Sequence, residues 1–136
     1  MNKIPCILLV DDDETTNYVN TLIIKKSGIV EEIMVALNGQ QAHAIIQNHF
    51  STDNPECKSD IPLIVLLDIN MPIMDGLEFM EFFDSLEDRI KEKVTVIVLT
   101  TSSHPNDLEK MYEYGVQGFI NKPLQREELE ELANLQ

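Results

Sequence analysis

Five side chains of the kinds that handle metal ions and phosphate each stand just after a short apolar stretch of the sequence. They are Asp11, Asp12, Asp68, Thr100 and Lys122. The stretch before Asp68, Leu63 to Leu67, is continuously apolar, which is typical of a strand buried on both faces of a sheet. Ligands of an open parallel sheet bind just outside the carboxyl ends of its strands. We therefore expect these five side chains to meet at one edge of a sheet and to form a functional site there.

Three carboxylates at one edge need compensating positive charge. Two unit charges about 4 Å apart repel by roughly 4 kcal/mol at an effective dielectric constant near 20. Lys122 offsets one of the three negative charges, and a divalent cation would offset the other two. Oxygen ligands without His or Cys favour Mg²⁺, with Mn²⁺ as a substitute. The expected ligands are Asp11, Asp12, Asp68 and the main-chain carbonyl of Asn70.

A carboxylate beside a metal ion, faced by an amine and a hydroxyl, is suited to phosphoryl transfer. Asp68 would be the nucleophile and phosphoacceptor. The metal ion and Lys122 would neutralise charge on the phosphoryl oxygens, and the Thr100 hydroxyl would donate to one of them. The new negative charge on Asp68 would draw Thr100 and Lys122 inward and move the ends of their strands.

The rest of the pattern predicts the elements that must position these residues. Apolar runs predict five strands, over residues 5–10, 32–37, 62–67, 94–99 and 117–120. Helical spacing of apolar residues follows each strand. The expected helices cover about 14–26, the stretch after the Asn38-Gly39 turn to about 50, and about 76–86, 105–114 and 125–134. In the first helix, Tyr18, Leu22 and Ile23 are expected to face the core, and Asn38-Gly39 is expected to form a turn. This alternation indicates an α/β fold, a parallel sheet with helices on both faces.

Length, composition and charge limit the classes of protein to which this chain can belong. The chain has 136 residues, 43% hydrophobic and 25% charged, so we expect residues 1–136 to form a single domain. No apolar run approaches the roughly 20 residues of a membrane span, and the N-terminus lacks the profile of a signal peptide. A cytoplasmic location is therefore expected. The formal net charge of −14 argues against direct binding of nucleic acid, which needs stripes of Lys and Arg.

The chain resembles the receiver domains of response regulators in two-component signalling. The motifs that carry the resemblance are Asp11-Asp12, the run Asp68-x-x-Met71-Pro72-x-Met74-Asp75-Gly76, Thr100 after an apolar strand, and Lys122-Pro123. The match runs from about residue 5 to about residue 133. It implies the flavodoxin-like (βα)5 fold, a doubly wound five-stranded parallel sheet of order 2-1-3-4-5.

The resemblance also implies the direction of phosphoryl flow. Asp68 would accept the phosphoryl group from the phosphohistidine of a histidine kinase or of a histidine phosphotransfer protein. Asp12, Asp68 and the Asn70 carbonyl would hold Mg²⁺ directly, and Asp11 would help through water. The protein would then be a signalling protein and not an enzyme, although it would catalyse its own phosphorylation and dephosphorylation.

Further positions correspond to the switch of the family. Thr100 and Lys122 would bind the phosphoryl group, and Thr100 with Phe119 would form the switch. Phe119 replaces the commonest tyrosine, which removes a hydroxyl group from that switch. Asn70 and Ser102 fall where relatives tune the lifetime of the phosphorylated state, so both are expected modulators.

The resemblance is to stand-alone, chemotaxis-regulator-like receivers, because no DNA-binding or enzymatic domain follows Gln136 in this sequence. A downstream protein would bind the face made by the fourth helix, the fifth strand and the fifth helix. That face would include Asn106, Asp107, Lys110, Gln117 and Gln125.

Two alternatives remain open at this point. Residues 11–15 contain the DxDxT pattern of haloacid-dehalogenase-type phosphatases, in which Asp11 would be the nucleophile. That family needs a further acidic pair after the lysine, whereas here Lys122 precedes the final helix and Asp68 would be idle. The other alternative is a receiver-like binding module that is never phosphorylated.

Overall fold

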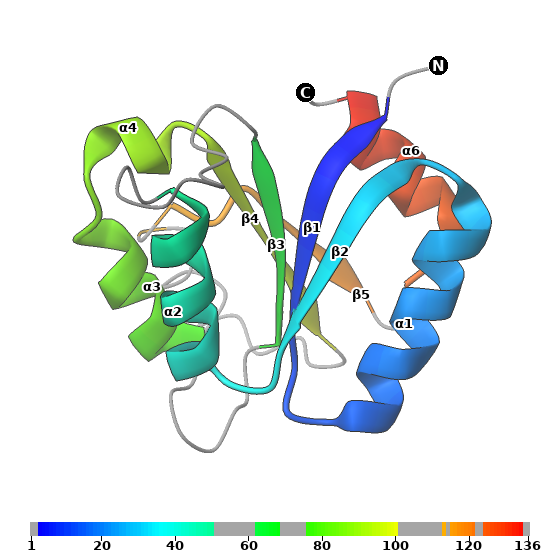
Figure 1. Ribbon diagram of the computed structural model, residues 1–136, viewed down its shortest axis with the longest axis horizontal. Coiled ribbons are helices and arrows are strands. Elements are labelled where there is room, and N and C mark those ends of the chain that lie inside the picture. The colour runs from blue at the N-terminus through cyan, green and yellow to red at the C-terminus, as the bar shows by residue number, and fades with distance from the viewer. Residues whose placement is uncertain are drawn as a thin grey trace.

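Five parallel strands form one sheet in the order β2-β1-β3-β4-β5 (Figure 1). The strands are β1 Ile4–Val10, β2 Val30–Ala36, β3 Leu63–Asp68, β4 Val94–Thr100 and β5 Gly118–Asn121. This confirms the parallel α/β fold read from the apolar runs and the flavodoxin-like strand order that the resemblance implied. The predicted strand boundaries differ from the observed ones by at most two residues.

This computed structural model describes residues 3–50, 62–68, 76–100, 113, 115–121 and 124–134. For Asp68, Gly76, Leu77, Thr100 and Asn121 it describes the main chain only. Asn70, Ser102 and Lys122 lie outside the described residues, as do the loop predicted over 51–61 and most of the helix predicted over 105–114.

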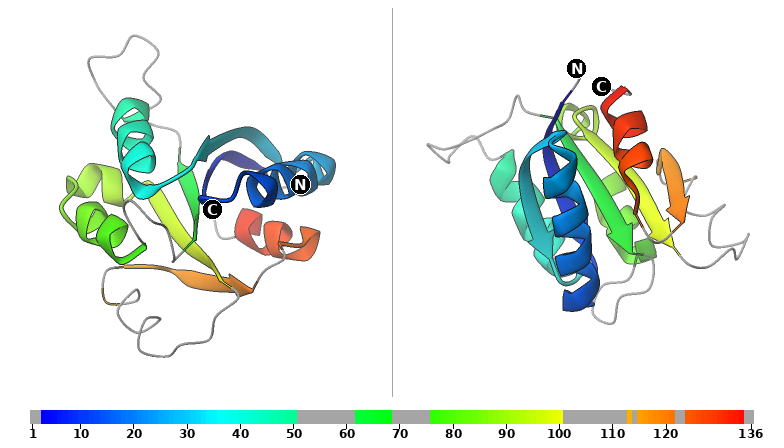
Figure 2. Two further views of the ribbon diagram at one scale, coloured as in Figure 1. Left: turned by 90° about the horizontal axis from the view of Figure 1, so that it is seen from below. Right: turned by 90° about the vertical axis from the view of Figure 1, so that its right-hand side faces the viewer.

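Helices cover both faces of the sheet. One face carries α1 Glu14–Ser27 and α6 Arg126–Asn134, and the other carries α2 Gly39–His49, α3 Gly76–Asp84 and the short α4 Asp88–Lys91. Figure 2 shows the same two groups of helices on opposite sides of the sheet when the molecule is seen from below. The sequence pattern did not predict α4. None of the described helices is long and apolar enough to cross a lipid bilayer.

The central strands supply the core on both sides of the sheet. In β1, Leu8 and Val10 pack on the side of α2 and α3, whereas Ile7 and Leu9 pack on the side of α1 and α6. In β3, Val65 and Leu67 alternate with Ile64 and Leu66 in the same way. Successive side chains of a strand point to opposite faces, so a strand covered on both faces must be apolar throughout.

The prediction for the inward face of α1 is wrong for Tyr18 and Leu22, whereas Ile23 packs against the core as predicted. Tyr18 is 67% exposed and Leu22 is 40% exposed, while Ile23 is partly buried. The residues that α1 buries are Asn17, Asn20, Ile24 and Ser27, which follow one stripe at helical spacing. Three of these four residues are polar, so a search for an apolar stripe selects the neighbouring face.

The ends of the first two helices are fixed by local hydrogen bonds. Asn38 is the N-cap of α2 and not part of a separate turn, because its Oδ1 accepts from the main-chain N–H of Gln41 at 2.8 Å. The predicted stop after α1 is confirmed by Gly28, which has a φ of 69°. Such a left-handed conformation is accessible to glycine at little cost.

Candidate functional site

The strand registers bring the described site residues Asp11, Asp68 and Thr100 to one edge of the sheet, the lower edge in Figure 1. Val10 of β1 pairs with Leu67, and Asp68 at the end of β3 pairs with Leu99. Thr100 at the end of β4 pairs with Asn121, the residue before Lys122. The main chain therefore brings the ends of β3, β4 and β5 to the same edge as the acidic loop after β1.

Asp11 is held by hydrogen bonds from three directions. Asp11 is buried, with only 4% of the residue exposed. Its main-chain N–H donates to the Ala36 carbonyl of β2 at 3.1 Å, and its main-chain carbonyl accepts from Nδ2 of Asn17 at 2.8 Å. Its Oδ1 accepts from the main-chain N–H of Asp13 at 3.0 Å. The position of this carboxylate is thus fixed by β2, by α1 and by its own loop.

Asp12 contrasts with its two acidic neighbours. The side chain of Asp12 is exposed and makes no hydrogen bond or ion pair with any described residue. Asp13 serves as the N-cap of α1, where its Oδ1 accepts from the N–H of Thr15 at 3.0 Å and its Oδ2 from the Thr16 hydroxyl at 2.8 Å. Of these neighbours, Asp12 is therefore the carboxylate best placed to bind a ligand from solvent.

The donor set at this edge fits a hard divalent cation. The described part of the chain contains no group of three or more His, Cys, Asp or Glu side chains arranged to hold a metal ion. The side chains of Asp68 and Asn70 lie outside that part. The donors that can be described, on Asp11 and Asp12, are carboxylate oxygens, which Mg²⁺ and Mn²⁺ prefer.

Phe119 lies in β5, where it pairs with Val98 and is partly buried against the core on the side of α2 and α3. This places the predicted switch aromatic one strand position before Ile120, which pairs with Leu99. The structure describes one arrangement of the chain, so the switching role of Phe119 stays a prediction.

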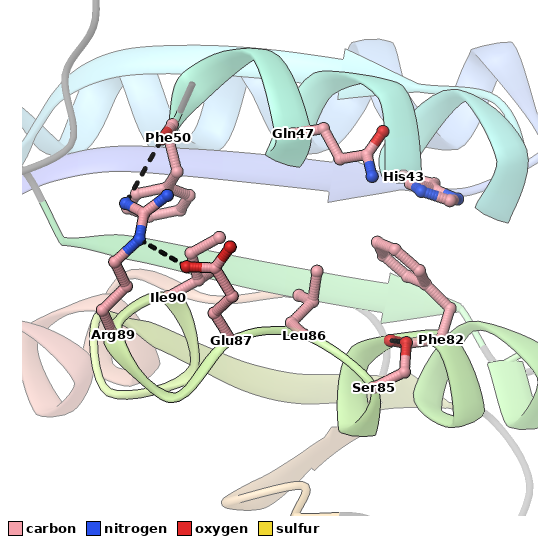
Figure 3. A pocket seen from close by; sticks show the side chains of 9 residues that line it. All are labelled: His43, Gln47, Phe50, Phe82, Ser85, Leu86, Glu87, Arg89 and Ile90. Carbon is pink, nitrogen blue, oxygen red and sulfur yellow. Dashed lines mark hydrogen bonds and ion pairs between the residues drawn. The ribbon is translucent and has the colours of Figure 1, made fainter. Parts of the chain in front are cut away.

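A hollow of about 490 Å³ lies elsewhere, between α2 and the α3–α4 segment (Figure 3). The imidazole ring of His43 stacks on Phe82 at one end, with ring centroids 3.6 Å apart. At the other end Arg89 pairs with Glu87 at 2.7 Å and donates to the Phe50 carbonyl at 3.4 Å. Among the described residues, neither Asp11, Asp12 nor Phe119 lines this hollow.

Sequence reasoning missed one residue of the site. Asn17 holds the main-chain carbonyl of Asp11, but an asparagine inside a predicted helix carries no motif and is usually a surface residue. Its position four residues after Asp13, on the same stripe as Ile24, is the signal that would have marked it as inward-facing.

The chain belongs to the family of response regulator receiver domains, whose family model matches residues 7–134. It is therefore a receiver domain of two-component signalling. Among curated relatives, the response regulator Rcp1 of Synechocystis sp. is 31% identical over 116 residues, covering 85% of this chain and 75% of Rcp1. The hybrid signal transduction histidine kinase I of Dictyostelium discoideum is 31% identical over 135 residues, which cover 98% of this chain and 7% of the kinase.

Solved structures support the same assignment. A two component response regulator from Cytophaga hutchinsonii is similar with a TM-score of 0.84 and 32% identity, covering 98% of this chain and 96% of that protein. The Mn²⁺-bound form of Rcp1 is similar with a TM-score of 0.68 and 27% identity, covering 95% of this chain and 88% of that protein.

Proposed function

We propose that this receiver domain accepts a phosphoryl group on Asp68 from the phosphohistidine of a histidine kinase or a histidine phosphotransfer protein. The observation that carries the proposal is the strand register, which brings the acidic loop after β1, Asp68 and Thr100 to one edge of the sheet. The similarity to a hybrid histidine kinase supports a partner of that class.

In the proposed reaction a carboxylate oxygen of Asp68 attacks phosphorus and forms a P–O bond. The bond between phosphorus and the donor's imidazole nitrogen breaks, and that nitrogen keeps the electron pair. Lys122 and the Thr100 hydroxyl bind the phosphoryl oxygens as charge develops on them. Hydrolysis of the acyl phosphate by water returns Asp68 to its carboxylate form.

Mg²⁺, or Mn²⁺ in its place, would be held by Asp12, Asp68 and the Asn70 carbonyl, with Asp11 acting through water. When bound, the cation neutralises charge on the carboxylates and on the phosphoryl oxygens. The buried, hydrogen-bonded Asp11 and the exposed Asp12 suit these two different roles. The relative Rcp1, whose structure contains Mn²⁺, is consistent with such a site.

We propose further that phosphorylation changes the surface that partners recognise. Thr100 and Phe119 would carry the switch, and Asn70 and Ser102 would set the lifetime of the acyl phosphate. The downstream protein would bind β5, α6 and the residues before β5; Gln117 and Gln125 are exposed there. The single receiver domain over residues 1–136 and the cytoplasmic location stay predictions.

The proposal is tested with acetyl phosphate as a small phosphodonor and intact mass as the readout. Wild-type protein should gain one phosphoryl group when Mg²⁺ is present and none when the cation is removed by a chelator. Asp68→Asn should abolish the gain. The matched control is Asp84→Asn, which changes an exposed aspartate of α3 that pairs with Lys91 of α4. This variant should still gain the phosphoryl group. Equal labelling of the Asp68→Asn and Asp84→Asn variants would contradict the proposal.

A further inference from the structure

Asn17 holds the loop after β1 that carries Asp11 and Asp12. It lies in the second turn of α1 and is only 4% exposed. Its side-chain Nδ2 donates to the main-chain carbonyl of Asp11 at 2.8 Å, and its own main-chain N–H donates to the Asp13 carbonyl at 3.0 Å. The same residue therefore bonds the main chain on both sides of Asp12.

These bonds fix the direction from which Asp12 leaves the main chain. A peptide group is planar, so a bond to the Asp11 carbonyl oxygen orients the whole plane that ends at the Cα of Asp12. The next plane is oriented as well, because the N–H of Asp13 donates to Oδ1 of Asp11 at 3.0 Å. The exposed Asp12 thus stands between two peptide planes that are each held by a hydrogen bond.

Asn17 carries a cost that an aliphatic side chain would avoid. Its Oδ1 is buried and has no hydrogen-bond partner in the part of the chain that the structure describes. A buried acceptor without a donor lowers stability. A leucine of similar size would remove this oxygen, but it would also leave the Asp11 carbonyl without the donor that Asn17 supplies.

Asn20 provides an internal comparison. It lies on the same stripe of α1, less than one turn further on, and is 5% exposed. It makes no hydrogen bond to residues 11–13, which are all described. Two buried asparagines of one helix therefore differ in whether they bond the acidic loop.

We propose that Asn17 is a positioning residue of the metal site, which acts by holding the Asp11–Asp12 peptide group so that the Asp12 carboxylate points at the cation. This inference rests on the proposed function, since it assigns Asp12 to a divalent cation. It adds a residue that acts from α1 without contacting the metal ion.

The test measures Mn²⁺ affinity by electron paramagnetic resonance of the unbound ion, in wild-type protein and in Asn17→Leu and Asn20→Leu variants. Asn17→Leu should weaken Mn²⁺ binding about 10-fold, as expected for loss of a residue that orients a metal ligand. Asn20→Leu should bind Mn²⁺ within about 2-fold of wild type. Asn17→Ala and Asn20→Ala repeat the comparison if a leucine variant fails to fold.

A second readout needs no metal. Amide hydrogen exchange at Asp12 and Asp13 should be several-fold faster in the Asn17 variant than in the Asn20 variant, because the loop loses its bond to α1. Equal Mn²⁺ affinity and equal exchange in the two variants would overturn the role of Asn17 alone. Failure of wild-type protein to bind Mn²⁺ would overturn the proposed metal site and this inference together.

Discussion

Val10 of β1 pairs with Leu67 of β3, so the next residue of each segment, Asp11 after β1 and Asp68 at the end of β3, stands at the same edge of the sheet. The register is defined by apolar contacts on both faces, since Val10 and Leu67 pack against one group of helices and Leu9 and Leu66 against the other. A slip by one residue would turn every side chain to the wrong face. The core thus fixes where the main chain of Asp11 and Asp68 lies.

The neighbours Asp12 and Asp13 should separate metal binding from stability. Asp13→Ala removes the N-cap of α1 and should lower the free energy of unfolding by about 1 kcal/mol, with Mn²⁺ affinity retained within a few-fold. Asp12→Ala should change the unfolding free energy by less than about 0.5 kcal/mol. Its Mn²⁺ affinity should fall by more than about 10-fold. Urea unfolding measures the stability of both variants, and Mn²⁺ titration measures their affinity. Weaker Mn²⁺ binding in Asp13→Ala than in Asp12→Ala would assign the ligand role to Asp13.

Two serines with the same local hydrogen bond should differ because one is buried. Oγ of Ser27 donates to the Ile24 carbonyl and Oγ of Ser85 to the Phe82 carbonyl, each at 2.6 Å. Ser27 is buried and also accepts from the N–H of Ile29, whereas Ser85 is exposed.

Ser27→Ala should therefore cost about 1–2 kcal/mol of unfolding free energy, since it leaves buried main-chain groups unpaired. Ser85→Ala should cost less than about 0.5 kcal/mol. Chemical denaturation of the two variants checks this, and equal losses would show that burial of Ser27 does not control its contribution.

Glu128 should make stability depend on pH. Burial raises the pKa of its carboxyl above the ordinary value of 4.5, repulsion from Glu131 and Glu127 adds to the rise, and the Gln125 N–H opposes it. A raised pKa means that the folded protein binds this proton more tightly than the unfolded chain. The contribution of the group is therefore present below pH 4.5 and lost as pH rises through the raised pKa.

Glu128→Gln cannot ionise there and keeps an oxygen that accepts from Gln125. Its unfolding free energy should exceed that of wild type by a margin that grows as pH rises from 4.5 through the raised pKa of Glu128. Glu127→Gln removes the same charge from an exposed position and should show a margin that changes less with pH. A Glu128→Gln margin that shrinks as pH rises would contradict the assignment.

Lys122 should matter for the chemistry more than for folding. Lys122→Ala should slow phosphorylation by acetyl phosphate by about 10²–10³-fold, the usual cost of losing one preorganised electrostatic contact to a reacting oxyanion. Lys91→Ala, which removes a lysine paired with Asp84 on a distant segment, is the control and should react at the wild-type rate. The measurement is the initial rate of phosphoprotein formation at saturating Mg²⁺.

The fold was predictable because its central strands are apolar throughout. Leu63 to Leu67 read as a doubly buried strand, and the structure shows all five residues buried. The inward face of α1 was not predictable by the same rule, because Asn17 and Ser27 are buried for the hydrogen bonds they make. The site residues could be named from strand ends, but the bond from Asn17 to Asp11 depends on three-dimensional packing that sequence spacing does not encode.

The most direct test of the account identifies which carboxylate carries the phosphoryl group. Wild-type protein is treated with acetyl phosphate and Mg²⁺, the acyl phosphate is trapped by borohydride reduction, and the reduced residue is located by peptide mass spectrometry. The account predicts reduction at Asp68, with Asp11 and Asp12 unmodified. Reduction at Asp11 with Asp68 intact would contradict the account and favour the phosphatase alternative. No reduction at any aspartate would also contradict it and favour a binding module that is never phosphorylated.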